Sequence, residues 1–414
     1  MVSNLGAAGL ERDPRNDRQL RRWAPVRFVP FDYQEDIIAG LRNLAGTNQG
    51  LGMLMMPTGS GKTSTVAAAL LRDMKSTHSA DALIVWIAPQ LELLTQAASA
   101  IERVWASGEG PDSLDILFLK SSATPPQPGR PAVILATPLS AANFLQRNNL
   151  LDRTEYLVFD EAHHLGAERF GSEWRDLVSR ATRNRLALGL SATPTRTVQT
   201  SFSELEASLG NRIIYPKRLL PDPVATLTSR GVLSKISFQA VRGIPAHCKA
   251  ISHTRDAQKM LTSDPDYWLA CVECAQAFGK PLIVYCPDRL SGSLFACHLR
   301  HIGVNAEYID GDDAYSIRIA ALERFRDGRT SVLVNVHLLL EGVDAPSASG
   351  ALLTYRIQSE IRLSQVVGRV MRGSALGGTD AATVVCADLD LVRQLSYGAH
   401  TRDFGAYWSR GVAV

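Results

Sequence analysis

The chain has 414 residues, 45% of them hydrophobic and 21% charged, and these proportions are typical of a globular protein with about two domains. Its net charge of +3 excludes a strongly cationic coat, so any nucleic-acid site must be local. No apolar run approaches the about 18 residues of a membrane span, and six cysteines without a basic and apolar leader predict a cytoplasmic protein with no membrane partner.

Short apolar runs separated by helix-like stretches recur along the chain in two series. Runs without polar alternation are typical of strands buried on both faces, and strands that alternate with helices predict parallel sheets with helices outside. The first series is GMLMMP, ALIVWIAP, DILFLK, AVILATP, YLVFDEA and LALGLSATP, and the second is PLIVYCP, AEYID, SVLVNV, GALLTYR and ATVVCADL. The sequence therefore predicts an α/β fold with two tandem domains, each a mostly parallel sheet flanked by helices.

The break between the two series predicts the domain boundaries. The intervening YPKRLLPDPV carries prolines that suit a connection better than a sheet interior. We expect an N-terminal arginine-rich tail at 1–27, a first domain at 28–215, a linker or insertion at 216–265, a second domain at 266–390 and a C-terminal tail at 391–414.

The stretch MMPTGSGKTS, residues 55–64, has the residues of a phosphate-binding loop between a buried strand and a helix. Glycine adopts backbone angles that other residues avoid, so the turn can present its N–H groups to phosphate oxygens at a helix N-terminus. Lys62 would reach the β- and γ-phosphates, and the Thr63 hydroxyl would hold Mg²⁺. Met56 replaces the first glycine of the full pattern. The predicted turn comprises Thr58, Gly59, Ser60 and Gly61.

In YLVFDEAHHLG, residues 156–166, an apolar strand ends in two adjacent carboxylates. Asp160 at the strand tip would hold Mg²⁺ through its water shell, and Glu161 would act as general base on the attacking water. His163 is either a core histidine or a residue that couples this site to its neighbours, and we expect the coupling role. Phosphate loop and carboxylates together predict an ATPase.

The DEAH spelling at residues 160–163, together with PTGSGKT, resembles superfamily 2 helicases. The closer resemblance is to the branch that holds DNA repair translocases and the motors of type I and type III restriction enzymes. It spans residues 30–375 and implies two RecA-like domains with ATP and Mg²⁺ bound between them.

Two further motifs of the first domain carry this resemblance. FDYQEDII is similar to the adenine-recognition element, which implies that Gln34 bonds the adenine edge and that Tyr33 or Phe31 packs near the ring. GLSATPTR is similar to the third motif of the family. The resemblance implies that Ser191 and Thr193 link hydrolysis to domain movement.

The resemblance also implies where a nucleic-acid strand would lie. Gln90 in IAPQLELLTQ and Thr137 in LATPLS stand in motifs that contact the strand, although Leu91 replaces an arginine that many relatives carry. NVHLLLEGVDAP is similar to the fifth motif, so Gly342 and Asp344 would approach the nucleotide sugar or the strand from the second domain.

The stretch QVVGRVMR, residues 365–372, matches the sixth motif and supplies Gln365, Arg369 and Arg372. The two arginines are three residues apart, so both would lie on one face of a helix. By spacing alone the two arginines are more typical of a solvated basic helix face. With the other motifs present, we expect both guanidinium groups to point at the γ-phosphate held by the first domain.

The sequence thus predicts a nucleic-acid-dependent ATPase that translocates on or unwinds DNA. The alternatives are an ATP-driven remodelling or regulatory subunit of a DNA repair or anti-phage defence complex without processive unwinding, or an RNA helicase. Because GLSATPTR and EGVDAP look more like the DNA branch, single-stranded or forked DNA is expected in preference to RNA. A protein partner that supplies specificity is a further expectation.

Overall fold

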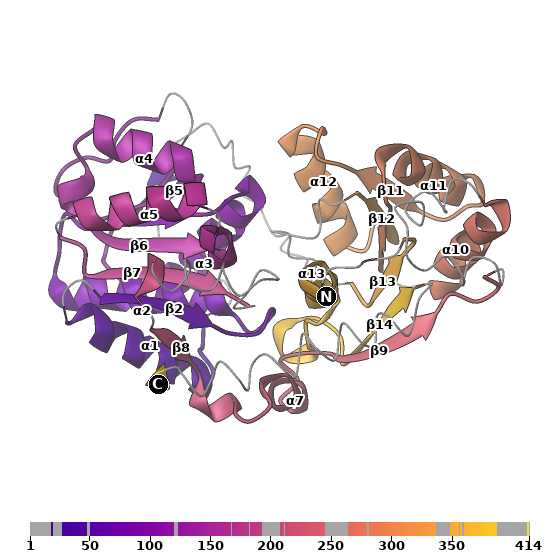
Figure 1. The fold of residues 1–414 in the computed structure, drawn as a ribbon, viewed down its shortest axis with the longest axis horizontal. Coiled ribbons are helices and arrows are strands. Elements are labelled where there is room, and N and C mark those ends of the chain that lie inside the picture. Colours follow the sequence, from indigo (N-terminus) through magenta and orange to yellow (C-terminus); the bar gives the residue numbers. More distant parts are fainter. Residues whose placement is uncertain are drawn as a thin grey trace, which may run out of the picture.

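The computed structural model describes residues 18–19, 27–47, 50–119, 123–166, 168–181, 183–192, 208–210, 212–244, 264–279, 281–336, 348–355, 357, 360–386 and 412–413. Within these ranges the chain forms two sheets side by side, each with helices on its faces (Figure 1). The predicted fold class, two tandem RecA-like domains, is confirmed. None of the described helices combines the length and the apolar character of a membrane span.

The first sheet has the strand order β1-β4-β5-β3-β6-β7-β2-β8-β15 among the described residues. Neighbouring strands run parallel except β1 and β4. The bounds are β1 (Arg18–Gln19), β2 (Gly50–Met55), β3 (Leu83–Ile87), β4 (Asp115–Phe118), β5 (Ala132–Ala136), β6 (Thr154–Asp160), β7 (Leu186–Ser191), β8 (Ile213–Tyr215) and β15 (Val412–Ala413). Strands from both predicted tails, β1 and β15, thus pair with this sheet.

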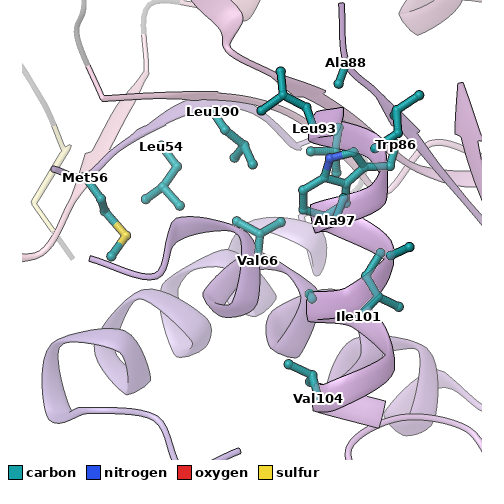
Figure 2. Close-up of a cluster of buried hydrophobic side chains, with 14 of the residues drawn as sticks. Leu54, Met56, Val66, Trp86, Ala88, Leu93, Ala97, Ile101, Val104 and Leu190 are labelled. Carbon is teal, nitrogen blue, oxygen red and sulfur yellow. The ribbon is translucent and has the colours of Figure 1, made fainter. Parts of the chain in front are cut away.

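Helices cover both faces of the first sheet because its strands are apolar on both sides. On β3, Ile84 and Trp86 belong to the buried cluster that includes side chains of α1, α2 and α3, and Figure 2 shows Trp86 beside α2 and α3, whereas Val85 and Ile87 belong to the cluster that includes side chains of α4 and α5. The helical elements are α1 (Asp32–Ala45), α2 (Lys62–Thr77), α3 (Leu91–Ala106), α4 (Pro138–Arg147), α5 (Glu168–Arg180), η1 (Leu151–Arg153) and η2 (Ala162–Gly166).

The second sheet is parallel throughout its described strands, in the order β11-β12-β10-β13-β14-β9. The strands are β9 (Lys235–Ala240), β10 (Leu282–Tyr285), β11 (Ala306–Ile309), β12 (Val332–Asn335), β13 (Gly350–Leu353) and β14 (Ala381–Cys386). The helical elements are η3 (Lys217–Leu219), α7 (Pro223–Ser229), α10 (Pro265–Phe278), α11 (Arg289–His301), α12 (Tyr315–Arg326), α13 (Glu360–Val370) and η6 (Ser374–Leu376).

One part of the predicted linker, 216–265, belongs to the second domain. Strand β9 lies inside this range and pairs with β14 from Lys235 to Ala240. It is an edge strand, and its Ile236 and Phe238 pack against the core while Lys235 and Ser237 are exposed. This alternation differs from the continuous apolar runs of the inner strands, which is why the sequence pattern missed it. The other predicted boundaries stay proposals.

A glycine on β7 allows the turn after β6 to lie close to the sheet. A Cβ on Gly189 would come within 2.8 Å of the Ala162 Cβ and 2.7 Å of Leu209 Cδ1. Ala162 begins η2, the short helix that follows Asp160 and Glu161. The two carboxylates are therefore positioned by packing against β7 as well as by their own strand.

We expect Gly189→Ala to destabilise the protein, because the added methyl group needs space that Ala162 and Leu209 already fill. Overpacking of this kind costs about 1–3 kcal/mol of unfolding free energy. Urea unfolding followed by circular dichroism measures the loss. Gly311→Ala is the matched control, since a Cβ there has no neighbour within 4 Å. Equal losses in the two variants would contradict the packing role of Gly189.

Candidate functional site

The phosphate loop, residues 57–61, connects β2 to α2. Gly59 and Gly61 have φ values of 81° and 86°, in the left-handed region that favours glycine. Gly61 is the N-cap of α2, and no side chain caps this helix end, which suits an anion. Ser60 donates its hydroxyl to the Pro57 carbonyl oxygen at 2.6 Å and its N–H to the same atom at 3.2 Å. Both donors of Ser60 therefore shape the loop, and the predicted contact of Ser60 with the nucleotide stays a prediction.

Three charged groups of the first domain meet next to this loop. Lys62 begins α2, and its Nζ donates to the Met56 carbonyl oxygen at 3.3 Å. Thr63 follows it in the first turn of α2. Burial lowers the pKa of Lys62, while the charges of Glu161 and Asp160 oppose this shift. The lysine and the two carboxylates are thus close enough to interact electrostatically.

The two carboxylates have different electrostatic environments. Burial and the charge of Glu161 raise the pKa of Asp160 to about 6. Burial would also raise the pKa of Glu161, but His163 and the charges of Lys62 and Arg369 hold it below its usual range. His163 is buried, with its Nδ1 3.3 Å from Glu161 Oε2. The surrounding charges therefore favour the ionised form of Glu161, which is the form that a general base requires.

The backbone at Glu161 is strained. Its φ is 54°, a left-handed value that is rare outside glycine, and its N–H donates to Asp160 Oδ1 at 3.0 Å. The tight turn places two consecutive carboxylates in one site. Sequence analysis missed Trp86, a fully buried residue of β3 whose indole lies near enough to Asp160 to lower its pKa, although its nitrogen does not reach hydrogen-bond geometry.

Strand β7 lies between the strand of the carboxylates, β6, and the strand of the phosphate loop, β2. Ser191 is its buried last residue, paired with Met55 of β2 next to the loop. The predicted role of Ser191, which is to link hydrolysis to domain movement, stays a prediction. Thr193 lies outside the described residues.

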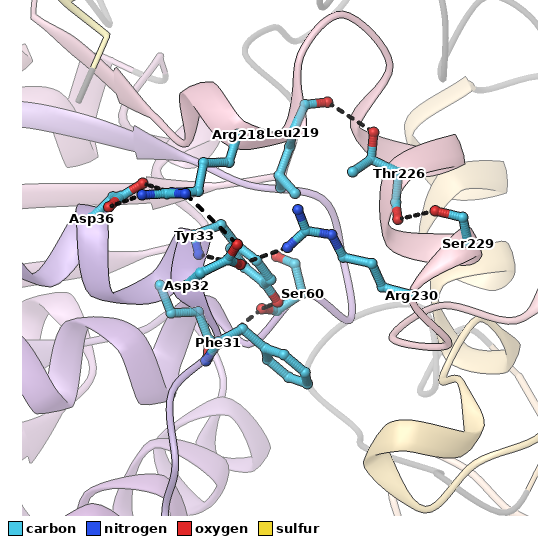
Figure 3. Close-up of polar contacts among 11 residues, drawn as sticks. Phe31, Asp32, Tyr33, Asp36, Ser60, Arg218, Leu219, Thr226, Ser229 and Arg230 are labelled. Carbon is cyan, nitrogen blue, oxygen red and sulfur yellow. Dashed lines mark hydrogen bonds and ion pairs between the residues drawn. The ribbon is translucent and has the colours of Figure 1, made fainter.

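The predicted adenine element is tied to the phosphate loop (Figure 3). The Gln34 side chain accepts from the Phe31 N–H at 2.9 Å and donates from Nε2 to the Ser60 carbonyl oxygen at 3.1 Å. Tyr33 is fully buried, and its hydroxyl donates to the same carbonyl at 2.9 Å. Its ring stacks on that of Phe31 with centroids 5.7 Å apart. Of the two aromatic candidates, the partly exposed Phe31 is therefore better placed to meet a base.

Helix α13 of the second domain lies against the phosphate loop. A Cβ on Gly368 would lie 2.5 Å from Thr58 Cγ2, so the helix backbone and the loop are in direct contact. The charge of Arg369 acts on both Lys62 and Glu161. Gln365 lies one turn earlier on α13. The fifth-motif residues, Gly342 and Asp344, lie outside the described residues.

Arg372 does not share a helical face with Arg369, contrary to the prediction. Helix α13 ends at Val370, and Arg372 instead forms an antiparallel bridge with Leu233, next to β9. Because Arg372 lies two residues beyond the end of α13, the helical spacing that would place it on the same face as Arg369 does not apply. The Arg372 position is therefore set by backbone pairing.

The two predicted strand contacts follow neighbouring strands. Gln90 is the N-cap of α3 after β3, and Thr137 is the N-cap of α4 after β5. Neither helix N-terminus has a side-chain cap, so both can interact with phosphates. The Thr137 hydroxyl donates to Ser140 Oγ at 2.9 Å.

These residues fit a nucleoside triphosphate with a divalent cation. Glycines at positive φ, an uncapped helix and a lysine suit the phosphates, and a Cβ on Gly61 would collide with Gln34 Nε2. Asp160 and Glu161 repel each other when both are ionised, which is the electrostatic situation that a cation relieves.

The comparisons with known proteins agree with this site. A model described as DEAD/DEAH box helicase matches residues 32–201, and one described as Helicase conserved C-terminal domain matches residues 267–374. The ATP-dependent RNA helicase dbp10 of Aspergillus fumigatus is 25% identical over 386 residues, which cover 85% of this chain and 43% of the relative. The chain thus spans less than half the length of this curated relative.

Solved structures share the fold. S. cerevisiae Dbp5 bound to RNA and ADP BeF3 has a TM-score of 0.59 and 16% identity, covering 93% of this chain and 89% of that one. The ATP-dependent Type ISP restriction-modification enzyme LlaBIII bound to DNA has a TM-score of 0.63 and 15% identity, covering 92% of this chain and 30% of that one. The same arrangement of domains therefore occurs in both an RNA-bound and a DNA-bound protein.

We expect Gly368→Ala to lower ATP turnover, because its methyl group would push α13 and Arg369 away from the phosphate loop. A displacement of about 1 Å in a catalytic group can cost about 100-fold in rate. Thermal stability should not fall, because this contact lies between two domains that can move apart and because alanine favours the helix by about 1 kcal/mol. Steady-state turnover and a thermal melt measure both effects, with Gly311→Ala as control. Turnover within about twofold of the unaltered chain would exclude this contact from the working enzyme.

Proposed function

The chain belongs to the superfamily 2 helicases, and we propose that it carries the two-domain core of an ATP-dependent RNA helicase. The expectation of DNA in preference to RNA is wrong, because the curated relatives are named ATP-dependent RNA helicases. The narrower assignment to the DNA repair and restriction branch is not confirmed by these relatives.

The observation that carries the proposal is the composite site between the sheets. Lys62, Asp160 and Glu161 come from the first domain, and Arg369 comes from the second. A triphosphate bound at the loop would meet all four charged groups only while the two domains are close together. Loss of the γ-phosphate removes the anion that both domains bind, and the domains can then separate.

Each charged residue has a distinct role in this proposal. Lys62 neutralises phosphate oxygens, and the ionised Glu161 orients the attacking water and accepts its proton. Asp160 and Thr63 would hold Mg²⁺, which supplies charge neutralisation at the phosphates when it is bound. Arg369 stabilises charge that develops on the transferred group, a role worth about 10³–10⁵ in rate for an arginine of this kind.

An RNA strand would lie across the carboxyl ends of β3 and β5. The uncapped N-termini of α3 and α4 meet there and offer backbone N–H groups to phosphates, with Gln90 and Thr137 at the two caps. From the second domain, Gly342 and Asp344 are proposed to approach the nucleotide sugar or the strand. Contacts to the sugar–phosphate backbone bind with little sequence preference.

We expect Lys62→Ala and Glu161→Gln each to reduce ATP turnover by about 100-fold or more, since a positioned general base alone contributes about 10²–10⁴. Glu161→Gln keeps the size of the side chain and should retain ATP binding, whereas Lys62→Ala should weaken it. Turnover and equilibrium binding of ATP measure the two effects. Full turnover in either variant would refute the site assignment.

RNA should stimulate ATP turnover more strongly than DNA of the same sequence. A matched panel of single-stranded RNA, single-stranded DNA and their duplexes at one salt concentration tests this, because backbone binding depends strongly on salt. A strand-displacement assay on the RNA duplex then distinguishes unwinding from ATP-driven remodelling. Equal or stronger stimulation by DNA would contradict the proposed substrate.

A further inference from the structure

The connecting segment, residues 216–234, packs against the first domain before it enters the second sheet. Arg218 forms an ion pair with Asp36, and Arg230 with Asp32, so two cations of the segment bind the first turns of α1, which contain the adenine element (Figure 3). The segment also has an apolar side in the core. Its buried residues include Leu219, Leu227, Val232 and Leu233. The segment therefore has a defined position relative to the nucleotide site.

The end of the connecting segment touches both halves of that site. A Cβ on Gly59 would lie 3.0 Å from Leu233 Cδ2, so Leu233 packs on the phosphate loop. The same residue pairs with Arg372 in the antiparallel bridge. The adjoining N–H of Gly373 donates to the Val232 carbonyl oxygen at 2.9 Å. The chain just before β9 thus lies between the loop and the residues that follow α13.

Ser234 is the polar residue at this junction, and it is 1% exposed. Its hydroxyl lies 2.7 Å from the Arg372 carbonyl oxygen and 2.5 Å from the Thr379 carbonyl oxygen, and its N–H donates to the Met371 carbonyl oxygen at 2.7 Å. The Thr379 N–H also donates to the Arg372 carbonyl oxygen, at 3.0 Å. Ser234 therefore closes the base of the loop at residues 372–379 and fixes the backbone at Arg372.

We propose that Ser234 is a positioning residue for ATP hydrolysis, which acts by holding Arg372 in place relative to the phosphate loop. The inference rests on the proposed function and adds to it the predicted role of Arg372, the sixth-motif arginine that follows α13. One hydroxyl proton shared by two carbonyl oxygens restricts the backbone from which the Arg372 side chain extends. Without this hydroxyl the base of the loop can open, and the backbone that carries the Arg372 guanidinium group is no longer held in one position.

The role predicts a specific kinetic signature. In the proposed function, Lys62 and the phosphate loop bind ATP from the first domain, whereas Ser234 acts on Arg372 of the second domain. Loss of the hydroxyl should therefore lower kcat while the KM for ATP stays within about twofold. We expect kcat to fall about tenfold, which corresponds to about 1.4 kcal/mol and is within the range for a lost buried hydrogen bond.

The experiment compares Ser234→Ala with Ser237→Ala in the full chain, at saturating RNA. Ser237 is the matched control because it lies on β9 of the same sheet, where its hydroxyl is 3.0 Å from Thr383 Oγ1 in an exposed position. Its removal should leave kcat unchanged. Thermal melts of both variants show whether the folded fraction has changed. If Ser234→Ala lowers only the melting temperature and leaves kcat intact, the positioning role is overturned and the proposed function still stands.

A double-mutant cycle with Arg372→Ala tests whether Ser234 acts through the arginine. The proposal expects Ser234→Ala to have no further effect on kcat once Arg372 is alanine. An equal reduction in both backgrounds would mean that Ser234 acts independently, which contradicts the proposal. Full turnover by Arg372→Ala alone would remove Arg372 from the ATP site and would refute the inference, whereas the roles proposed for Lys62, Glu161 and Arg369 would stand.

Discussion

Thr58 in the phosphate loop and Gly368 in α13 are so close that one methyl group does not fit between them. The electrostatics of the site depend on this contact, because it brings the next residue, Arg369, near enough to influence Lys62 and Glu161. If water separated Arg369 from this site by more than about one Debye length, dissolved salt would largely screen its charge. A glycine at this place in the helix is therefore a requirement of close approach between two domains, since helix stability alone would favour alanine.

The two consecutive carboxylates show how local strain and charge are combined. A left-handed backbone at Glu161 costs about 1–2 kcal/mol, and the packing of η2 on Gly189 helps to hold that conformation. The turn also places Asp160 and Glu161 in different electrostatic environments. Asp160 is the one that burial and a like charge disfavour as an anion, and Glu161 is the one that His163 and two cations keep ionised.

The contiguous motifs could be predicted from the sequence because their chemistry is local. The loop glycines, Lys62 and the carboxylates each follow a strand that the apolar runs already identify. What could not be predicted depends on contacts between distant segments or on where an element ends. Arg372 falls outside α13 because the helix stops at Val370, and Ser234 meets it from 138 residues away. The preference for DNA over RNA was misjudged because short motif spellings describe the ATP site and carry little information about the nucleic-acid strand.

Strand β9 has a practical consequence for dividing the protein into parts. It precedes the expected start of the second domain, yet it covers one whole edge of the second sheet by pairing with β14. A fragment that begins after Ala240 would leave the backbone N–H and C=O groups of β14 without that neighbour, and exposed strand edges of this kind promote self-association. A fragment of the second domain that stays monomeric should therefore include β9, although this strand lies in the segment that the sequence pattern predicts to be a linker.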